Sequence, residues 1–217
     1  MQRTITVKGT GSATAAPDLI RISMSLESKE YTYALTMKSA EEEIESLKEA
    51  IVSAGFDRKD LKTLDFDVRT EYNNEKDHFG NYQRIFKGYT CTHQLKLEFD
   101  LDTKRLASAL NAIADCSARP TLSIDFTVKD PTAISTELLR SAAVNARVKA
   151  ETLCAASGVK LGDLLTISYN WGEIDIVSRT DVDMPMAKSK RGLDCNIEIE
   201  PDDISLSDTA TFIWEIK

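Results

Sequence analysis

The stretch AGFDRKDLKT, residues 54–63, returns in the second half of the chain as SGVKLGDLLT, residues 157–166. In the two stretches a glycine fits the end of a helix, an aspartate fits a turn in which it accepts backbone N–H groups, and a threonine fits the start of a strand. The repetition therefore predicts one folding unit built twice, not an active-site motif used twice. The identical pairs are Gly55 and Gly158, Asp60 and Asp163, Leu61 and Leu164, and Thr63 and Thr166.

Amphipathic helices are predicted before both glycines. Over residues 32–54, apolar side chains recur at three- and four-residue spacing, while glutamates and lysines take the opposite side, so one face of the helix is buried. A second long helix is predicted over 132–157, and its many alanines would let it approach a sheet or another helix closely. A shorter helix is predicted over 103–116.

Alternation of apolar and polar residues predicts the strands. It is clear from Ile20 to Leu26 and has the period of a strand with one buried face. Such strands belong to an antiparallel or mixed sheet with one wet face. The same period is found at Leu64-Phe66-Val68, Leu95-Leu97-Phe99-Leu101 and Leu122-Ile124-Phe126-Val128, and further strands are expected at Ile5 and Val7, at 165–171 and at 210–216.

The order of these elements predicts an α+β fold. Both halves run strand, long helix, glycine, strand, strand, so we expect a mainly antiparallel sheet with the two long helices and the short helix packed on one face. We expect a single domain over 1–217, with pseudo-repeats at about 18–102 and 119–217 joined by the short helix.

Two polar segments do not fit the repeat. Residues 73–86 read as a long hairpin, and residues 176–203 are longer than structureless loops in compact domains usually are. The longer segment is either disordered or committed to a partner or ligand. We expect a possible protein partner to use 73–86 and 176–203.

Composition excludes several classes of protein. The net charge of −8 would repel phosphate backbones, so we expect no nucleic-acid partner. No stretch approaches the ~20 apolar residues that cross a bilayer, so no membrane insertion is expected. The N-terminus lacks a signal-peptide pattern, which predicts a cytoplasmic protein, or a periplasmic one if a leader was removed.

The cysteines and histidines give no sign of metal or redox chemistry. Cys91, Cys116, Cys154 and Cys195 lack CxxC spacing, and buried reduced thiols are expected, with Cys195 exposed. Neither His78 nor His93 has an acidic or cysteine partner at ligand spacing. We expect His93 on a strand surface or facing a pore.

Other catalytic signatures fail as well. Gly9-Thr10-Gly11 is followed by a strand, not a helix, and is read as a tight turn. There is no GxSxG elbow and no thiol-protease signature. The sequence therefore predicts no catalytic, cofactor-binding or metal-binding residue and no cofactor. The carboxylates, which alternate with apolar residues and so predict a hydrated sheet face, are Asp65, Asp67, Glu98, Asp100 and Asp125.

Several separated stretches resemble the SIMPL-domain family, a mostly bacterial group of unknown function. The resemblance implies an α+β fold, no accepted catalytic residues and self-association, since known members include periplasmic and outer-membrane-associated antigens that form ring or channel-like oligomers, and a eukaryotic signalling adaptor. The stretches, whose order and spacing carry the resemblance, are ITVKGTGSATAAPDLIRISMSLES (5–28), AGFDRKDLKTLDFDVRTEYN (54–73), KGYTCTHQLKLEFDL (87–101), AVNARVKAETLCAASGVKLGDLLTI (143–167) and IEPDDISLSDTATFIWEI (199–216).

Three functions follow as hypotheses. The first is a non-enzymatic SIMPL-domain protein that forms a homo-oligomer. The second is a small-ligand or metabolite-binding module with a pocket between the helices and the sheet. The third is a hydrolase acting through carboxylates. Aromatic residues that would line the pocket of the second hypothesis are Tyr72, Tyr82, Tyr89, Trp171 and Trp214.

Overall fold

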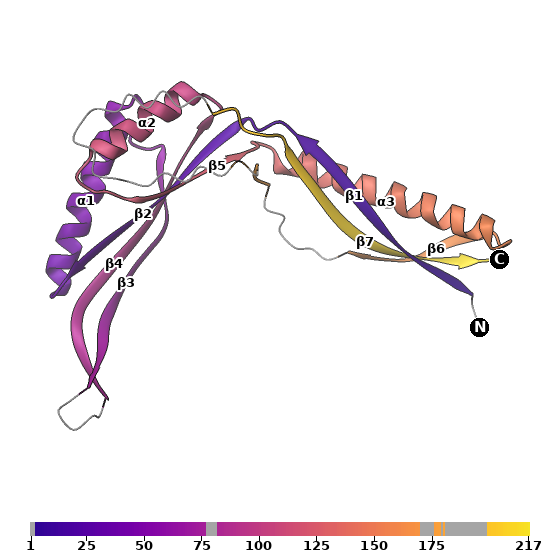
Figure 1. Cartoon of the computed structure of the whole chain (residues 1–217), viewed down its shortest axis with the longest axis horizontal. Coiled ribbons are helices and arrows are strands. Elements are labelled where there is room, and N and C mark those ends of the chain that lie inside the picture. Colours follow the sequence, from indigo (N-terminus) through magenta and orange to yellow (C-terminus); the bar gives the residue numbers. More distant parts are fainter. Residues whose placement is uncertain (1–2, 77–81, 170–175, 179, 181–198) are drawn as a thin grey trace. The chain divides into compact units, whose positions relative to one another are not determined.

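The computed structural model describes residues 3–76, 82–169, 176–178, 180 and 199–217. The chain forms two compact units. The terminal unit comprises Met1–Asp18, Thr127–Arg179 and Pro201–Lys217, and the central unit comprises Leu19–Phe126 and Thr180–Glu200. Each unit has its own sheet (Figure 1), so the α+β class is confirmed.

The central unit contains a four-stranded sheet in the order β3-β4-β2-β5. Strand β4 pairs antiparallel with both β2 and β3. The predicted alternation in β2 is confirmed, because Ile20, Ile22, Met24 and Leu26 are all buried in a core shared with the helices. The elements are β2 (Leu19–Glu30), α1 (Tyr33–Ser53), β3 (Leu61–Lys76), β4 (Tyr82–Asp100), α2 (Thr103–Asp115) and β5 (Thr121–Thr127).

The terminal unit contains a three-stranded antiparallel sheet in the order β1-β7-β6. Helix α3 runs along β1 and β7 (Figure 1), and its Ala146 and Ala150 pack against Val7, Phe212 and Trp214. The elements are β1 (Thr4–Ala15), α3 (Pro131–Ala156), β6 (Leu161–Tyr169) and β7 (Ile204–Ile216).

Glycines in β1 bring α3 unusually close to the sheet. A Cβ atom at Gly9 would collide with the carbonyl oxygen of Ala142, and one at Gly11 would collide with that of Leu138. The predicted close approach of the alanine-rich helix is confirmed. The prediction of a tight turn at 9–11 is wrong, because both glycines lie inside β1, where they mark a close backbone approach.

The two long helices end in the same way. Gly55 has φ +88° and Gly158 has φ +70°. Beyond them, the N–H of Phe56 donates to the Ile51 carbonyl at 3.2 Å, and the N–H of Val159 donates to the Cys154 carbonyl at 3.0 Å. This is the hydrogen bond of the Schellman motif, so the predicted role of both glycines is confirmed.

The aspartates of the repeated stretch differ from each other. The carboxylate of Asp60 accepts a hydrogen bond from the N–H of Asp57 at 3.0 Å, as predicted for a turn. Asp163, by contrast, lies within β6 and is exposed. The equivalence of the two stretches is therefore closest at the helix ends.

The structure has two sheets where the sequence predicts one. Each unit holds a long helix, an antiparallel hairpin, and a third strand beside the second strand of the hairpin: β2 beside β4, and β1 beside β7. In the second predicted repeat, 119–217, the first strand β5 pairs with β2 of the central unit instead. Alternation shows which residues are buried but not which sheet a strand joins. The internal duplication stays a prediction.

Candidate functional site

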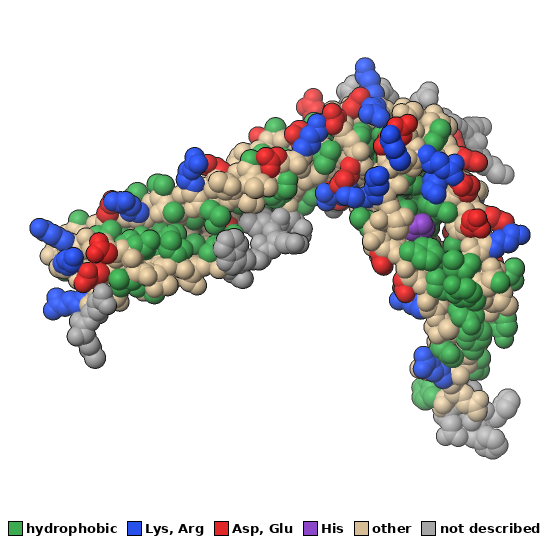
Figure 2. Space-filling model, turned by 180° about the vertical axis from the view of Figure 1, so that it is seen from behind, with side chains coloured by type: hydrophobic (Ala, Val, Ile, Leu, Met, Phe, Trp, Pro, Cys, Tyr) green, Lys and Arg blue, Asp and Glu red, His purple; other side chains and the backbone are tan. Residues whose placement is uncertain are grey.

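The long helix of the terminal unit leaves one strand of its sheet uncovered. The strand register sets Leu164 opposite Trp214 and Ile167 opposite Phe212, so Leu164 and Ile167 lie on the face that α3 covers. Helix α3, however, packs over β1 and β7. As a result Leu164, Leu165 and Ile167 are exposed by 45%, 43% and 56%. Figure 2 shows hydrophobic side chains gathered on the surfaces of both units.

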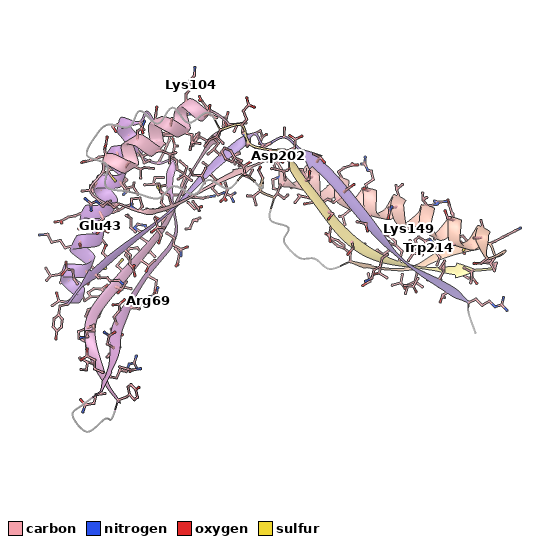
Figure 3. The ribbon with its side chains drawn as sticks, in the orientation of Figure 1. Glu43, Arg69, Lys104, Lys149, Asp202 and Trp214 are labelled. Carbon is pink, nitrogen blue, oxygen red and sulfur yellow. The ribbon has the colours of Figure 1, made fainter. Side chains whose placement is uncertain are left out.

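The opposite edge of the same sheet is closed by α3. The Ser12 N–H donates to Ser141 Oγ at 3.2 Å, and Lys149 Nζ donates to the Lys8 carbonyl at 3.2 Å. Together with Asn145, these helix residues are spaced by four and lie on one face of α3. Figure 3 labels Lys149 on this helix and Trp214 on β7.

Strand β6 has no comparable cover. In the described part of the chain β6 pairs with β7, and no described side chain hydrogen-bonds the outer edge of residues 161–168. Its residues 164–169 carry no charge. We call Leu164, Leu165 and Ile167, with the outer edge of β6, the β6 surface.

The corresponding edge strand of the central unit, β3, is protected differently. Leu64 and Phe66 are 56% and 46% exposed, so the prediction that they face a core is wrong: α1 covers β2 and β4 and does not extend over this edge. Strand β3 carries two register shifts, as β6 does, so the shifts do not distinguish the two edges. Charged side chains are a usual device that keeps sheet edges from associating. The charged residues of its first part are Lys62, Asp65, Asp67, Arg69 and Glu71.

A groove of about 460 Å³ lies between α1 and the β3–β4 pair. Met37 and Ile44 of the helix, with Phe66, give it apolar walls, and His93 lies in it half-buried. The rings of Phe66 and His93 meet edge to face at 5.1 Å. Lys38 and Glu41 add one charge of each sign to the lining.

His93 is held in this groove by its neighbours. Its Nε2 lies 2.9 Å from Thr63 Oγ1, within hydrogen-bonding distance. Burial lowers the pKa of His93, and the positive charge of Lys48 lowers it further. The ring is therefore kept in its neutral form over more of the pH range than a free histidine.

The aromatic residues predicted to line one pocket do not come together. Tyr72 and Tyr89 both contact Phe86, at 5.7 and 5.4 Å between ring centroids. Trp214 instead stacks on Phe212 in the core of the terminal unit. Trp171 lies outside the described residues, and Tyr82 is exposed. Phe86, at the centre of this cluster, was not predicted from the sequence.

The carboxylates on the sheet faces form ion pairs. Glu98 contacts Arg21 at 2.7 Å and Lys96 at 2.8 Å. Burial raises the pKa of Glu98, but the hydrogen bonds from Lys96 and Arg21 outweigh it and hold the pKa below its usual value. Asp67 pairs with Arg69 at 3.6 Å. At these positions each carboxylate is therefore paired with a basic side chain.

Other predicted residues divide between the described and undescribed parts. Cys91 and Cys154 are buried free thiols, as predicted, and Cys116 is half-buried. The 73–86 segment does extend the β3–β4 hairpin, with Lys76 paired to Tyr82. His78, Cys195 and most of 176–203 lie outside the described residues.

The described residues contain no group of three or more His, Cys, Asp or Glu side chains placed to hold a metal ion. None of the helices built from them is both long and apolar enough to cross a membrane.

The sequence matches a known family over nearly its whole length. The family model SIMPL, described as a protein of unknown function (DUF541), matches residues 5–214. The chain belongs to the SIMPL family. The resemblance predicted from the sequence is thus confirmed.

The SIMPL relatives are distant in sequence. A "26 kDa periplasmic immunogenic protein" of Brucella abortus is 24% identical over 98% of this chain and 84% of its own length. The uncharacterised protein YggE of Edwardsiella ictaluri is 23% identical over 76% of this chain and 67% of its own. A solved structure, an uncharacterised conserved protein from Listeria innocua, covers 96% of this chain and 92% of its own at 10% identity, but its TM-score of 0.26 is too low to carry an argument.

Proposed function

We propose that this SIMPL protein is a non-enzymatic subunit that self-associates through the β6 surface. The observation that carries the proposal is the exposure of Leu164, Leu165 and Ile167 on β6, an edge strand that pairs with β7 alone among the described strands. In soluble proteins, exposed apolar patches usually mark interaction sites, and strand edges are usually protected by charges, bulges or other elements. A homo-oligomer is the partner we therefore expect.

Charge supports the choice of this surface. Copies of a chain with a net charge of −8 repel one another. A contact between uncharged surfaces brings no like charges together at the interface. Residues 164–169 of β6 are uncharged, whereas β3 carries charges of both signs. Of the two hairpin edges, β6 is therefore the one suited to contact a second copy.

The test is the molar mass of the purified chain over a wide range of concentration. Sedimentation equilibrium should give a mass above that of the 24.1 kDa monomer, rising with concentration. Ile167→Lys should lower it towards the monomer. Val144→Lys is the matched control, because Val144 is 59% exposed on α3, close to the 56% of Ile167. A wild-type chain that stays monomeric up to several hundred micromolar would contradict the proposal.

Small-ligand binding is the second candidate, and the groove beside His93 favours it. Its volume of about 460 Å³ falls in the range of ligand pockets, and its walls combine Met37, Ile44 and Phe66 with a few polar groups. A metabolite that binds there should raise the melting temperature by mass action. Phe66→Ala should abolish the effect, while Leu64→Ala, at a neighbouring exposed residue outside the groove, should not.

A carboxylate-dependent hydrolase has less support. A general acid needs a raised pKa, whereas ion pairing holds the pKa of Glu98 low. We therefore propose that the protein is not an enzyme.

The names of the relatives suggest a cellular compartment for this protein, which we state as a proposal. The Brucella protein is named as periplasmic. Of the two locations that the sequence predicts, the cytoplasm and the periplasm, this name favours the second. Fractionation of the native host with an antibody to this chain would decide between them.

A further inference from the structure

We infer that β6 of one copy pairs antiparallel with β6 of a second copy, which joins two three-stranded sheets into one continuous sheet across a twofold axis. This inference rests on the proposed self-association and specifies its partner strand. A twofold contact of this kind uses the same surface on both copies.

The two edges of the sheet of the terminal unit differ in how open they are to an added strand. Along the β1 edge, Ser141, Asn145 and Lys149 bond backbone groups of β1, so those groups are not open to another strand. Residues 161–168 of β6 have no such cover among the described residues. An added strand would therefore meet fewer occupied backbone groups beside β6 than beside β1.

The charge of β6 bears on the direction in which an added β6 strand would run. Asp163 is the one charged residue of β6. A parallel pair in register would set Asp163 beside Asp163, and like charges directly opposite destabilise a sheet. An antiparallel pair centred near Ile167 separates the two carboxylates and sets only uncharged residues opposite one another. Charge therefore favours the antiparallel arrangement.

Strand β6 is a better partner for β6 of a second copy than β3 of that copy would be. The register of β6 with β7 shifts before Leu164 and before Thr166, so its regular part runs from Thr166 to Tyr169. In a pair centred on Ile167, this part would set Ile167 against Ile167 and Thr166 against Ser168. A β3 strand would instead bring its charged side chains against an uncharged strand, where they would lose water without gaining a partner.

The experiment is charge complementation at the centre of the pair. Ile167→Lys and Ile167→Glu, each alone, should dissociate the protein because like charges would meet. An equal mixture of the two variants should associate roughly tenfold more tightly than either variant alone, because opposite charges would meet instead. Circular dichroism of each variant establishes that it is folded, and Val144→Lys controls for the addition of a charge elsewhere on the surface.

Each outcome bears on a different proposal. If wild-type chains associate and the mixture is no tighter than the single variants, β6 does not pair with β6, although self-association stands. If wild-type chains do not associate, the proposed function fails. Hydrogen exchange gives a second reading: amides of 161–169 should become protected as concentration rises, and protection of 61–76 alone would overturn the β6 pairing.

Discussion

The Oδ1 atom of Asn145, on α3, accepts a hydrogen bond at 3.0 Å from the backbone N–H of Thr10, on β1. With Ser141 and Lys149, this contact occupies backbone groups on the side of β1 away from β7. The helix thus takes the place that a further strand would otherwise have at this edge.

Removal of the Asn145 amide should loosen the β1 edge. We expect Asn145→Ala to lower the free energy of unfolding by about 1 kcal/mol, the usual net contribution of one hydrogen bond. Urea denaturation measures the loss, and the amide of Thr10 should exchange faster. Asn145→Asp keeps an acceptor oxygen and is the control. Equal losses in the two variants would show that the contact does not act through this oxygen.

A single methyl group at Gly11 should separate α3 from the sheet. Its Cβ would collide with the backbone carbonyl of Leu138, which cannot rotate away, so we expect Gly11→Ala to lower the free energy of unfolding by about 1 to 3 kcal/mol. In Gly162→Ala, the control, the new Cβ would lie 3.0 Å from the Glu215 carbonyl, and a smaller loss is expected. Chemical denaturation compares the two. A neutral Gly11→Ala would contradict the close packing.

The burial of His93 should make stability depend on pH. Because burial and Lys48 lower its pKa in the folded protein, the unfolded chain binds the proton more readily. Stability from this group is complete above the unfolded pKa of about 6.5 and decreases as pH falls towards the lower folded pKa. We expect His93→Gln to show a flatter curve than the wild type between neutral and mildly acid pH. His78→Gln is the control; an unchanged slope in His93→Gln would contradict the prediction.

The thiols should react in an order set by burial. Burial raises the pKa of Cys91, and the charges of Glu43 and Asp67 raise it further, so its reactive thiolate is scarce. Cys154 is also buried, whereas Cys116 is half-buried. A thiol reagent followed by peptide mass spectrometry should find Cys116 modified before Cys91 and Cys154, and Cys195 should react early if it is exposed as the sequence predicts. Rapid modification of Cys91 in the folded protein would contradict the core packing.

The sequence predicted the parts of the fold that depend on local chemistry. Helix ends at Gly55 and Gly158, and the buried face of Ile20 to Leu26, follow from backbone freedom and side-chain period. Both act within one element. These features can therefore be predicted without knowing which other helices or strands that element packs against.

Features that depend on distant parts of the chain were predicted wrongly or not at all. Phe66 and Ile167 alternate with polar neighbours as buried residues do, but each lies on an edge strand beyond the reach of its helix. The two sheets and the groove beside His93 depend likewise on which strands pair. The candidate surfaces were therefore not predicted, because their residues have the same alternating pattern as a buried strand face.

The pairing of β1 with β7 has a consequence for biosynthesis. Thr4 of β1 lies opposite Glu215 of β7, so β1 leaves the ribosome long before its partner strand has been made. The strands of the central unit, by contrast, all lie between Leu19 and Thr127 and can pair while synthesis continues. During that interval β1 must remain without its partner, and a chain truncated before residue 204 would retain a central sheet but leave its own N-terminus unfolded.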